Sequence, residues 1–174
     1  MYDGNLKTMS GRPALQFEQS LAHPLSRVWQ AVSTPSELEQ WFPAALSWEP
    51  ATGELLEAFG MQGKILEVEE PTRLAWEFNG DFYSFDLTEQ AAGTTLTFTY
   101  VFDADAPVAQ TAAGWDTYLQ KLEALLAGQP LSDKVAFANW DRPHEHYAAK
   151  FNVDPTPGRQ FWEQLKESLD LKQE

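Results

Sequence analysis

The feature that most constrains the fold is an apolar stripe in the C-terminal half of the chain. Residues 112–128 read AAGWDTYLQKLEALLAG, and their large apolar side chains recur at steps of three and four positions. This spacing predicts a helix with one buried face. Strand-like segments precede it, so we expect a sheet beneath the helix and a candidate binding site between the two. The intervening polar residues are expected to face water: Asp116, Gln120, Lys121 and Glu123.

The segments before this helix have the pattern of an antiparallel meander. Turn-forming residues recur roughly every ten positions. Asn79-Gly80 is the clearest hairpin turn, because both residues tolerate positive φ. Apolar and polar side chains alternate, as expected where one face of a sheet is buried and the other is wet. After a first strand at 15–22, the expected strands are 45–49, 54–59, 63–70, 73–79, 82–89 and 94–102.

Two short helices are expected between the first strand and the meander. Pro24 suits the first turn of a helix that ends near Ser33. Thr34, followed by Pro35 and Glu37, has the pattern of a capping box that opens a second helix. The predicted fold class is therefore α+β, with a curved antiparallel sheet of six to seven strands wrapped around a long C-proximal helix.

The order of these segments resembles the START-like (SRPBCC, pollen-allergen-like) superfamily, which has the helix-grip fold. Within it, the chain is similar to bacterial homologues of the activator of the ninety-kilodalton heat-shock-protein ATPase. The likeness rests on Pro24 to Val32, on Trp41-Phe42-Pro43, on the segment from Gly63 through Pro71 to Trp76, and on Gly114-Trp115 with Leu119, Leu122 and Leu126. It covers residues 14–128, which we interpret as one START-like domain.

The resemblance implies a cavity without naming its content, because this fold serves lipid and hormone carriers, cyclases, oxygenase domains and co-chaperones. The candidate cavity-lining residues are Trp76, Phe78, Tyr83, Phe85, Phe98, Tyr100, Trp115, Leu119 and Leu122, and Trp41 and Phe42 are candidates for the cavity lip. Tyr83 or Tyr100 offers a hydroxyl that can orient a ligand. The alternative is that the same side chains fill the space completely, since periodicity does not give a cavity volume.

Composition excludes several classes of partner and site. The chain has 26 acidic and 12 basic residues, and its net charge of −14 repels nucleic acid and anionic lipid. It has no cysteine, which excludes a disulfide, a thiolate metal site and a thiol nucleophile.

His144 and His146 would diverge on a helix, so no metal site is expected. No cofactor fingerprint appears, and we expect neither a cofactor nor a catalytic residue. Glu77 and Asp86 fall opposite the aromatic faces of their strands and are expected to be solvated.

The chain shows no apolar run near the roughly 18 residues that a membrane span needs, and its first residues lack the apolar region of a secretory signal. We therefore expect a soluble cytoplasmic protein.

Residues 129–174 are expected to form a helical C-terminal extension. Asp141-Arg142-Pro143 opens one helix, and Thr156-Pro157 opens another. Helices this short are marginal alone, so their apolar faces must pack on something. That surface belongs either to the same domain or to a second subunit or protein partner. The apolar residues concerned are Tyr147, Phe151, Phe161, Trp162, Leu165 and Leu169.

Three functions from different classes remain open. The favoured one is a non-catalytic module that binds a hydrophobic small molecule between sheet and helix. The second is a protein-interaction or co-chaperone-like regulator that acts through its surface, on a chaperone or another protein and in the context of stress response. The third is an enzyme of cyclase or hydrolase type, which needs convergent polar groups that the alternation does not show. A homodimer is also left open as a partner.

Overall fold

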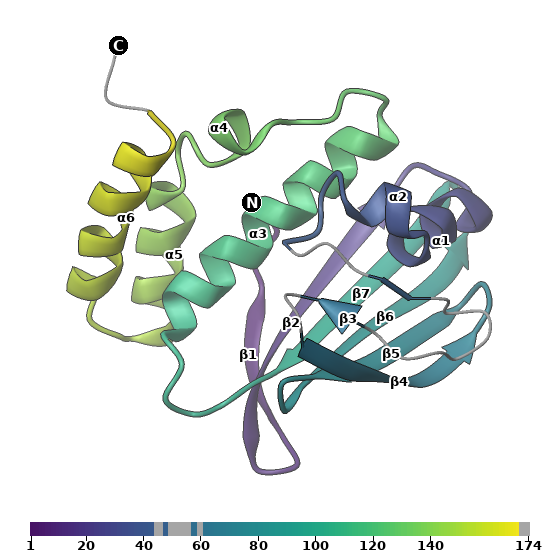
Figure 1. Ribbon diagram of the computed structural model, residues 1–174, viewed down its shortest axis with the longest axis horizontal. Coiled ribbons are helices and arrows are strands. Elements are labelled where there is room, and N and C mark those ends of the chain that lie inside the picture. Colours follow the sequence, from purple (N-terminus) through teal and green to yellow (C-terminus); the bar gives the residue numbers. More distant parts are fainter. Residues whose placement is uncertain (44–46, 49–56, 59–60, 171–174) are drawn as a thin grey trace.

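The structure is a computed structural model, and it describes residues 1–43, 47–48, 57–58 and 61–170. Within these residues, seven strands form one antiparallel sheet in the order β1-β2-β7-β6-β5-β4-β3 (Figure 1). The strands are β1 (Asn5–Met9), β2 (Arg12–Leu21), β3 (Glu57–Ala58), β4 (Met61–Glu69), β5 (Arg73–Phe78), β6 (Asp81–Gln90) and β7 (Gly93–Val101).

The long helix α3 lies across the concave face of the curved sheet, as Figure 1 shows. The helix α1 packs against β6 and β7, and α5 packs against α3. This is the predicted α+β helix-grip architecture. The helices are α1 (Leu25–Ser33), α2 (Pro35–Leu38), α3 (Val108–Leu126), α4 (Asp133–Ala136), α5 (Asp141–Phe151) and α6 (Thr156–Ser168). Among the described residues, no helix is both long and apolar enough to cross a membrane.

Turn chemistry sets the register of the meander. Asn79 and Gly80 have φ values of 54° and 83°, as the predicted hairpin between β5 and β6 requires. A second hairpin of this kind, at Ser10-Gly11 with φ values of 50° and 80°, joins β1 to β2. The sequence analysis missed β1, because all five of its residues are exposed at the sheet edge and carry no burial pattern. The predicted strand 45–49 lies mostly outside the described residues, as does most of 54–59.

The predicted capping box at the start of α2 is wrong in its contacts. The Thr34 side chain makes no capping hydrogen bond. Glu37 instead accepts a hydrogen bond from Nη2 of Arg27 on α1, at 3.0 Å. The two short helices are thus joined by an ion pair between them.

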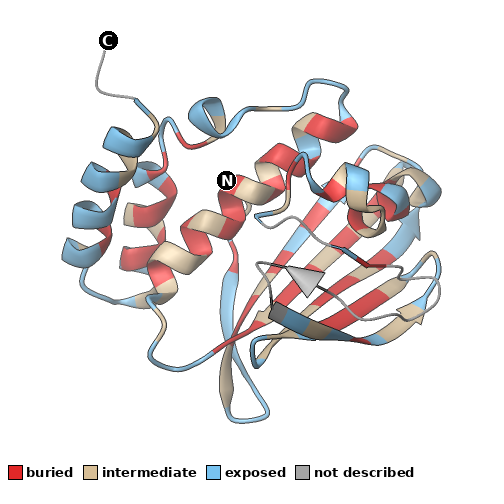
Figure 2. Ribbon diagram, in the orientation of Figure 1, coloured by how far each residue is buried: buried red, intermediate tan, exposed pale blue. Residues whose placement is uncertain are grey.

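The expectation that the polar residues of α3 face water is wrong for Asp116 and Lys121, although Glu123 is exposed as expected. Asp116 is completely buried, and Lys121 is only 7% exposed. Figure 2 shows α3 as buried or intermediate over most of its length, whereas α6 is largely exposed. The reason lies in the segment after residue 128: α4 and α5 contact α3 on the side away from the sheet. The Nζ atom of Lys121 accordingly pairs with Asp133 of α4 at 2.5 Å.

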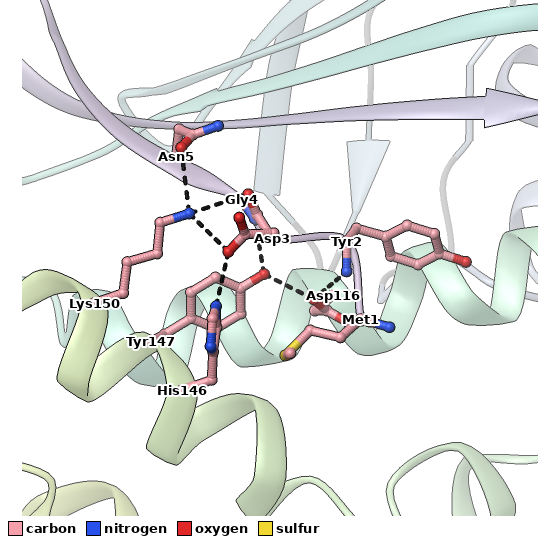
Figure 3. A network of polar contacts seen from close by, with 9 residues as sticks. All are labelled: Met1, Tyr2, Asp3, Gly4, Asn5, Asp116, His146, Tyr147 and Lys150. Carbon is pink, nitrogen blue, oxygen red and sulfur yellow. Dashed lines mark hydrogen bonds and ion pairs between the residues drawn. The ribbon is translucent and has the colours of Figure 1, made fainter.

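The buried carboxylate of Asp116 accepts hydrogen bonds from the N-terminal segment, from α5 and from α3 itself, and Figure 3 shows the first two. Its Oδ2 accepts from the Tyr147 hydroxyl at 2.7 Å and from the backbone N–H of Tyr2 at 2.8 Å. Its Oδ1 accepts from Gln120 at 2.8 Å. The Tyr147 hydroxyl in turn accepts from the N–H of Gly4 at 2.9 Å. These bonds compensate for the removal of the charge from water and tie the N-terminal segment to α3 and α5.

Replacing Tyr147 by Phe should therefore destabilise the fold by about 1–3 kcal/mol, because a buried carboxylate and a backbone N–H both lose a partner. Urea unfolding measures the effect. Tyr118→Phe is the control, since that tyrosine has no side-chain hydrogen bond to a described residue and should change stability little. Equal effects of the two changes would contradict the role given to the network.

Candidate functional site

The concave face of the sheet carries a layer of aromatic rings. Across the central strands, Tyr83 stands between Trp76 and Tyr100, and Phe85 stands beside Phe98. The rings of Trp76 and Tyr83 stack at 5.2 Å with an interplanar angle of 5°, and those of Tyr83 and Tyr100 stack at 4.7 Å. Alternation in β5, β6 and β7 places these side chains on one face. They form a continuous apolar surface beneath α3.

Trp115 joins α3 to this surface. Its indole lies 4.5 Å from the Phe98 ring, 5.7 Å from that of Tyr100 and 6.2 Å from that of Tyr83, between centroids. Phe42, which follows α2, packs on the same indole at 5.6 Å. One side chain of α3 thus contacts two strands and the segment after α2. Farther along the helix, Leu119 and Leu122 are 1% and 0% exposed and belong to the same core.

Burial varies across the predicted cavity-lining residues. Trp76, Phe85 and Phe98 are buried, whereas Phe78, Tyr83 and Tyr100 are half-buried and reach the solvent on one side. Of the two predicted lip residues, Phe42 is half-buried. Trp41 lies deeper than a lip residue would: it is fully buried, and its indole N–H donates to the carbonyl of Ala31 at 2.9 Å.

The polar groups beside the half-buried rings satisfy one another. The Tyr100 hydroxyl donates to Oδ2 of Asp81 at 2.7 Å, and Arg12 pairs with Oδ1 of Asp81 at 3.2 Å. Burial, followed by the negative charge of Asp81, raises the pKa of Tyr83 to about 12. Burial and the hydrogen bond to Asp81 also raise the pKa of Tyr100. Both phenols are therefore neutral near pH 7 and cannot serve as bases there, and the O–H of Tyr100 is already bound to Asp81.

The remaining polar candidates lie away from the rings. Glu77 is exposed, and Asp86 pairs with Arg73 on the convex face. His144 stacks on Trp140 at 5.1 Å, whereas His146 contacts Asp3 at 2.7 Å. Within the described part of the chain, no group of three or more His, Asp or Glu side chains is arranged to hold a metal ion.

Sequence reasoning missed two buried polar groups. Gln19 is 4% exposed and Trp48 is 4% exposed, and neither the Gln19 amide nor the Trp48 indole N–H has a hydrogen-bond partner among the described residues. The signal for Gln19 was present in the sequence. It occupies an inward position of β2, in step with Leu15, Phe17 and Leu21.

Comparison with known proteins gives the following matches. The family model described as "Activator of Hsp90 ATPase homolog 1-like protein" matches residues 22–127. A conserved protein of unknown function from Enterococcus faecalis has a similar structure, with a TM-score of 0.72, 18% identity, and coverage of 87% of this chain and 92% of that one. CalU16 from Micromonospora echinospora aligns with a TM-score of 0.65 and 22% identity, over 84% of this chain and 94% of its own.

DynU16, a protein of the dynemicin biosynthetic locus, is 30% identical with a TM-score of 0.57, over 67% of this chain and 48% of DynU16. No curated protein matches the sequence at a significant level.

The tyrosines of the native protein should ionise at an unusually high pH. All five have a raised pKa, with burial as the leading cause in each. An alkaline titration followed by phenolate absorbance should show little ionisation of the native protein near pH 10.0, the ordinary pKa, and about half ionisation there in denaturant. Because the unfolded chain releases these protons first, the stability that they contribute is complete below pH 10.0 and declines as the pH rises towards 12. Normal titration of the native protein would contradict the burial of the phenols.

Trp115→Ala should destabilise the protein by about 3–5 kcal/mol, because the indole is the main contact between α3 and the aromatic layer. Chemical denaturation measures the loss. Phe161→Ala, on a residue of α6 that is 41% exposed, is the control and should cost far less. Full stability of the Trp115 variant would contradict the packing described.

Proposed function

Because the chain belongs to the Activator of Hsp90 ATPase homolog 1-like family, we propose that it is a non-catalytic module that binds a hydrophobic small molecule between its sheet and α3. The observation that carries this proposal is the continuous layer of rings on the concave face, of which some are half-buried. Large flat side chains that are accessible on one side suit an apolar or aromatic ligand. The proposed lining residues are those named from the sequence, with Phe42 at the rim.

The charge of the site favours a neutral or cationic ligand. The Asp81 carboxylate lies beside Tyr100, and the whole chain carries a net charge of −14. Both features raise the energy of a negatively charged group near the rings. The neutral Tyr83 hydroxyl supplies a hydrogen bond that can orient a ligand once it has entered.

The same contacts argue against acid–base catalysis at the rings. A general base needs a pKa near the working pH and access to the substrate. The two phenols have raised pKa values, and the Asp81 carboxylate is engaged by both Tyr100 and Arg12. A role in binding therefore fits these groups better than a role in cyclisation or hydrolysis. The similarity to a protein of a biosynthetic locus is compatible with a small-molecule ligand.

A surface-acting, co-chaperone-like regulator is the second candidate, and family membership favours it. Such a role calls for a contiguous exposed apolar patch. The exposed large apolar residues of the described chain are instead spread over separate elements, including Leu6 on β1, Leu66 on β4 and Phe161 on α6. We therefore rank this function second. A chaperone partner, a homodimer and a cytoplasmic location remain predictions.

Leu119→Trp tests the proposed function. If the space beside α3 is hollow, the added indole should fit, leave the unfolding midpoint nearly unchanged and remove ligand binding. The neutral fluorescent probe N-phenyl-1-naphthylamine reports binding, and native mass spectrometry of the purified wild-type protein reports any co-purified compound. Leu165→Trp, on the half-buried face of α6, is the matched control and should bind the probe as the wild type does.

In a filled core, the Leu119 substitution would instead destabilise the protein by about 1–3 kcal/mol through overpacking. That result, together with no probe binding by the wild type, would overturn the proposal.

A further inference from the structure

One side chain on the concave face has no explanation in the packing alone. The carboxamide of Gln19 is buried, and its Nε2 and its Oε1 both lack a hydrogen-bond partner among the described residues. Burying an amide without partners costs about 1–3 kcal/mol by mutational measures. Groups of this kind are rare in native proteins, and their presence calls for a cause.

The position of Gln19 places it on the face of the sheet that carries the proposed ligand site. On β2, its side chain points to the same face as those of Phe17 and Leu21, and it lies opposite Leu96 of β7. A strand advances about 3.3 Å per residue, so the Cα of Gln19 is about 7 Å from that of Phe17. Phe17 pairs with Phe98, the ring that contacts Trp115 most closely. The amide therefore lies one step along the strand from the aromatic layer.

Apolar side chains occupy the neighbouring inward positions, as Leu15, Phe17, Leu21 and Leu96 are all buried. A leucine or methionine at position 19 would pack there without an unsatisfied group. A glutamine at this position is unfavourable for folding unless something else completes its hydrogen bonds.

We propose that Gln19 is the polar recognition group of the ligand site and that the ligand carries a neutral hydrogen-bond donor and acceptor side by side, as in a primary amide or lactam on an apolar ring system. This inference rests on the proposed function. Of the two unpaired amide atoms of Gln19, Nε2 donates and Oε1 accepts. A ligand that carries an acceptor next to a donor can therefore bind both atoms. A carboxylate offers acceptors only, and the charge of the chain repels it.

Trp48 is a second buried polar group on the concave side, beside Trp76 of β5 rather than beside Gln19 of β2. Its indole N–H is also buried without a partner among the described residues, and its ring meets that of Trp76 edge-on at 5.2 Å. The concave side thus has a second buried donor without a partner among the described residues, next to the aromatic layer.

Two probes of nearly equal shape test the inference. In 2-naphthamide the substituent is a primary amide, and in 2-isopropenylnaphthalene an apolar group of similar size replaces it. Isothermal titration calorimetry of the full chain should show that the wild type prefers the amide by about tenfold or more, the effect of hydrogen bonds to an otherwise unpaired buried group. Gln19→Met should remove this preference, so that the two probes bind with nearly equal affinity. It should leave the melting temperature unchanged or higher. Gln164→Met, on an exposed residue of α6, is the control and should keep the wild-type preference.

The outcomes separate this inference from the proposed function. If neither probe binds the wild type, the proposed function fails and the role of Gln19 fails with it. If both bind equally, the binding function stands and the role of Gln19 is overturned. An unchanged preference in Gln19→Met also overturns it, and a loss of stability in that variant would assign Gln19 a structural role. Should the methionine variant not fold, Gln19→Leu replaces it, and the comparison of the two probes on the wild type remains decisive by itself.

Discussion

The contact between Trp115 and the rings of the sheet is the interaction on which the other features depend. A curved antiparallel sheet with one aromatic face is unstable in water unless a second layer covers that face. Here α3 supplies the cover, and its indole touches side chains from β6, β7 and the segment after α2. The same contact fixes the spacing between helix and sheet, and this spacing decides whether a ligand can lie beside Leu119 and Leu122.

A second face of α3 is held by buried hydrogen bonds. Asp116 follows Trp115 and is rotated from it by about 100° around the helix axis, so its carboxylate leaves the aromatic layer and is bound by Tyr147 and the N-terminal segment. A helix held on both faces cannot move away from the sheet without breaking a network of buried hydrogen bonds. Under the proposed function, a ligand enters at the half-buried side of the aromatic layer, near Phe42, Phe78 and Tyr83. The buried polar contacts and the proposed binding site are thus linked through one helix.

Much of this arrangement follows from the sequence, because period-two alternation and helical spacing report which side chains share a face. The rings of β5, β6 and β7 and the apolar stripe of α3 were predictable in this way. Asp116 was misplaced, since its burial comes from a tertiary contact with α5 that no local pattern encodes. The edge strand β1 is exposed and so lacks alternation. Gln19 was the converse case, because its inward position follows from the pattern of β2 but the sequence analysis assigned it no role.

The most direct measurement of the central claim is the position of a bound apolar compound relative to Trp115. Intermolecular nuclear Overhauser effects between a naphthalene probe and isotope-labelled protein give that position in solution. The account predicts contacts from the probe to the indole of Trp115 and to the methyl groups of Leu119 or Leu122. Contacts confined to exposed apolar residues such as Val135 or Phe161, with none to Trp115, would contradict it.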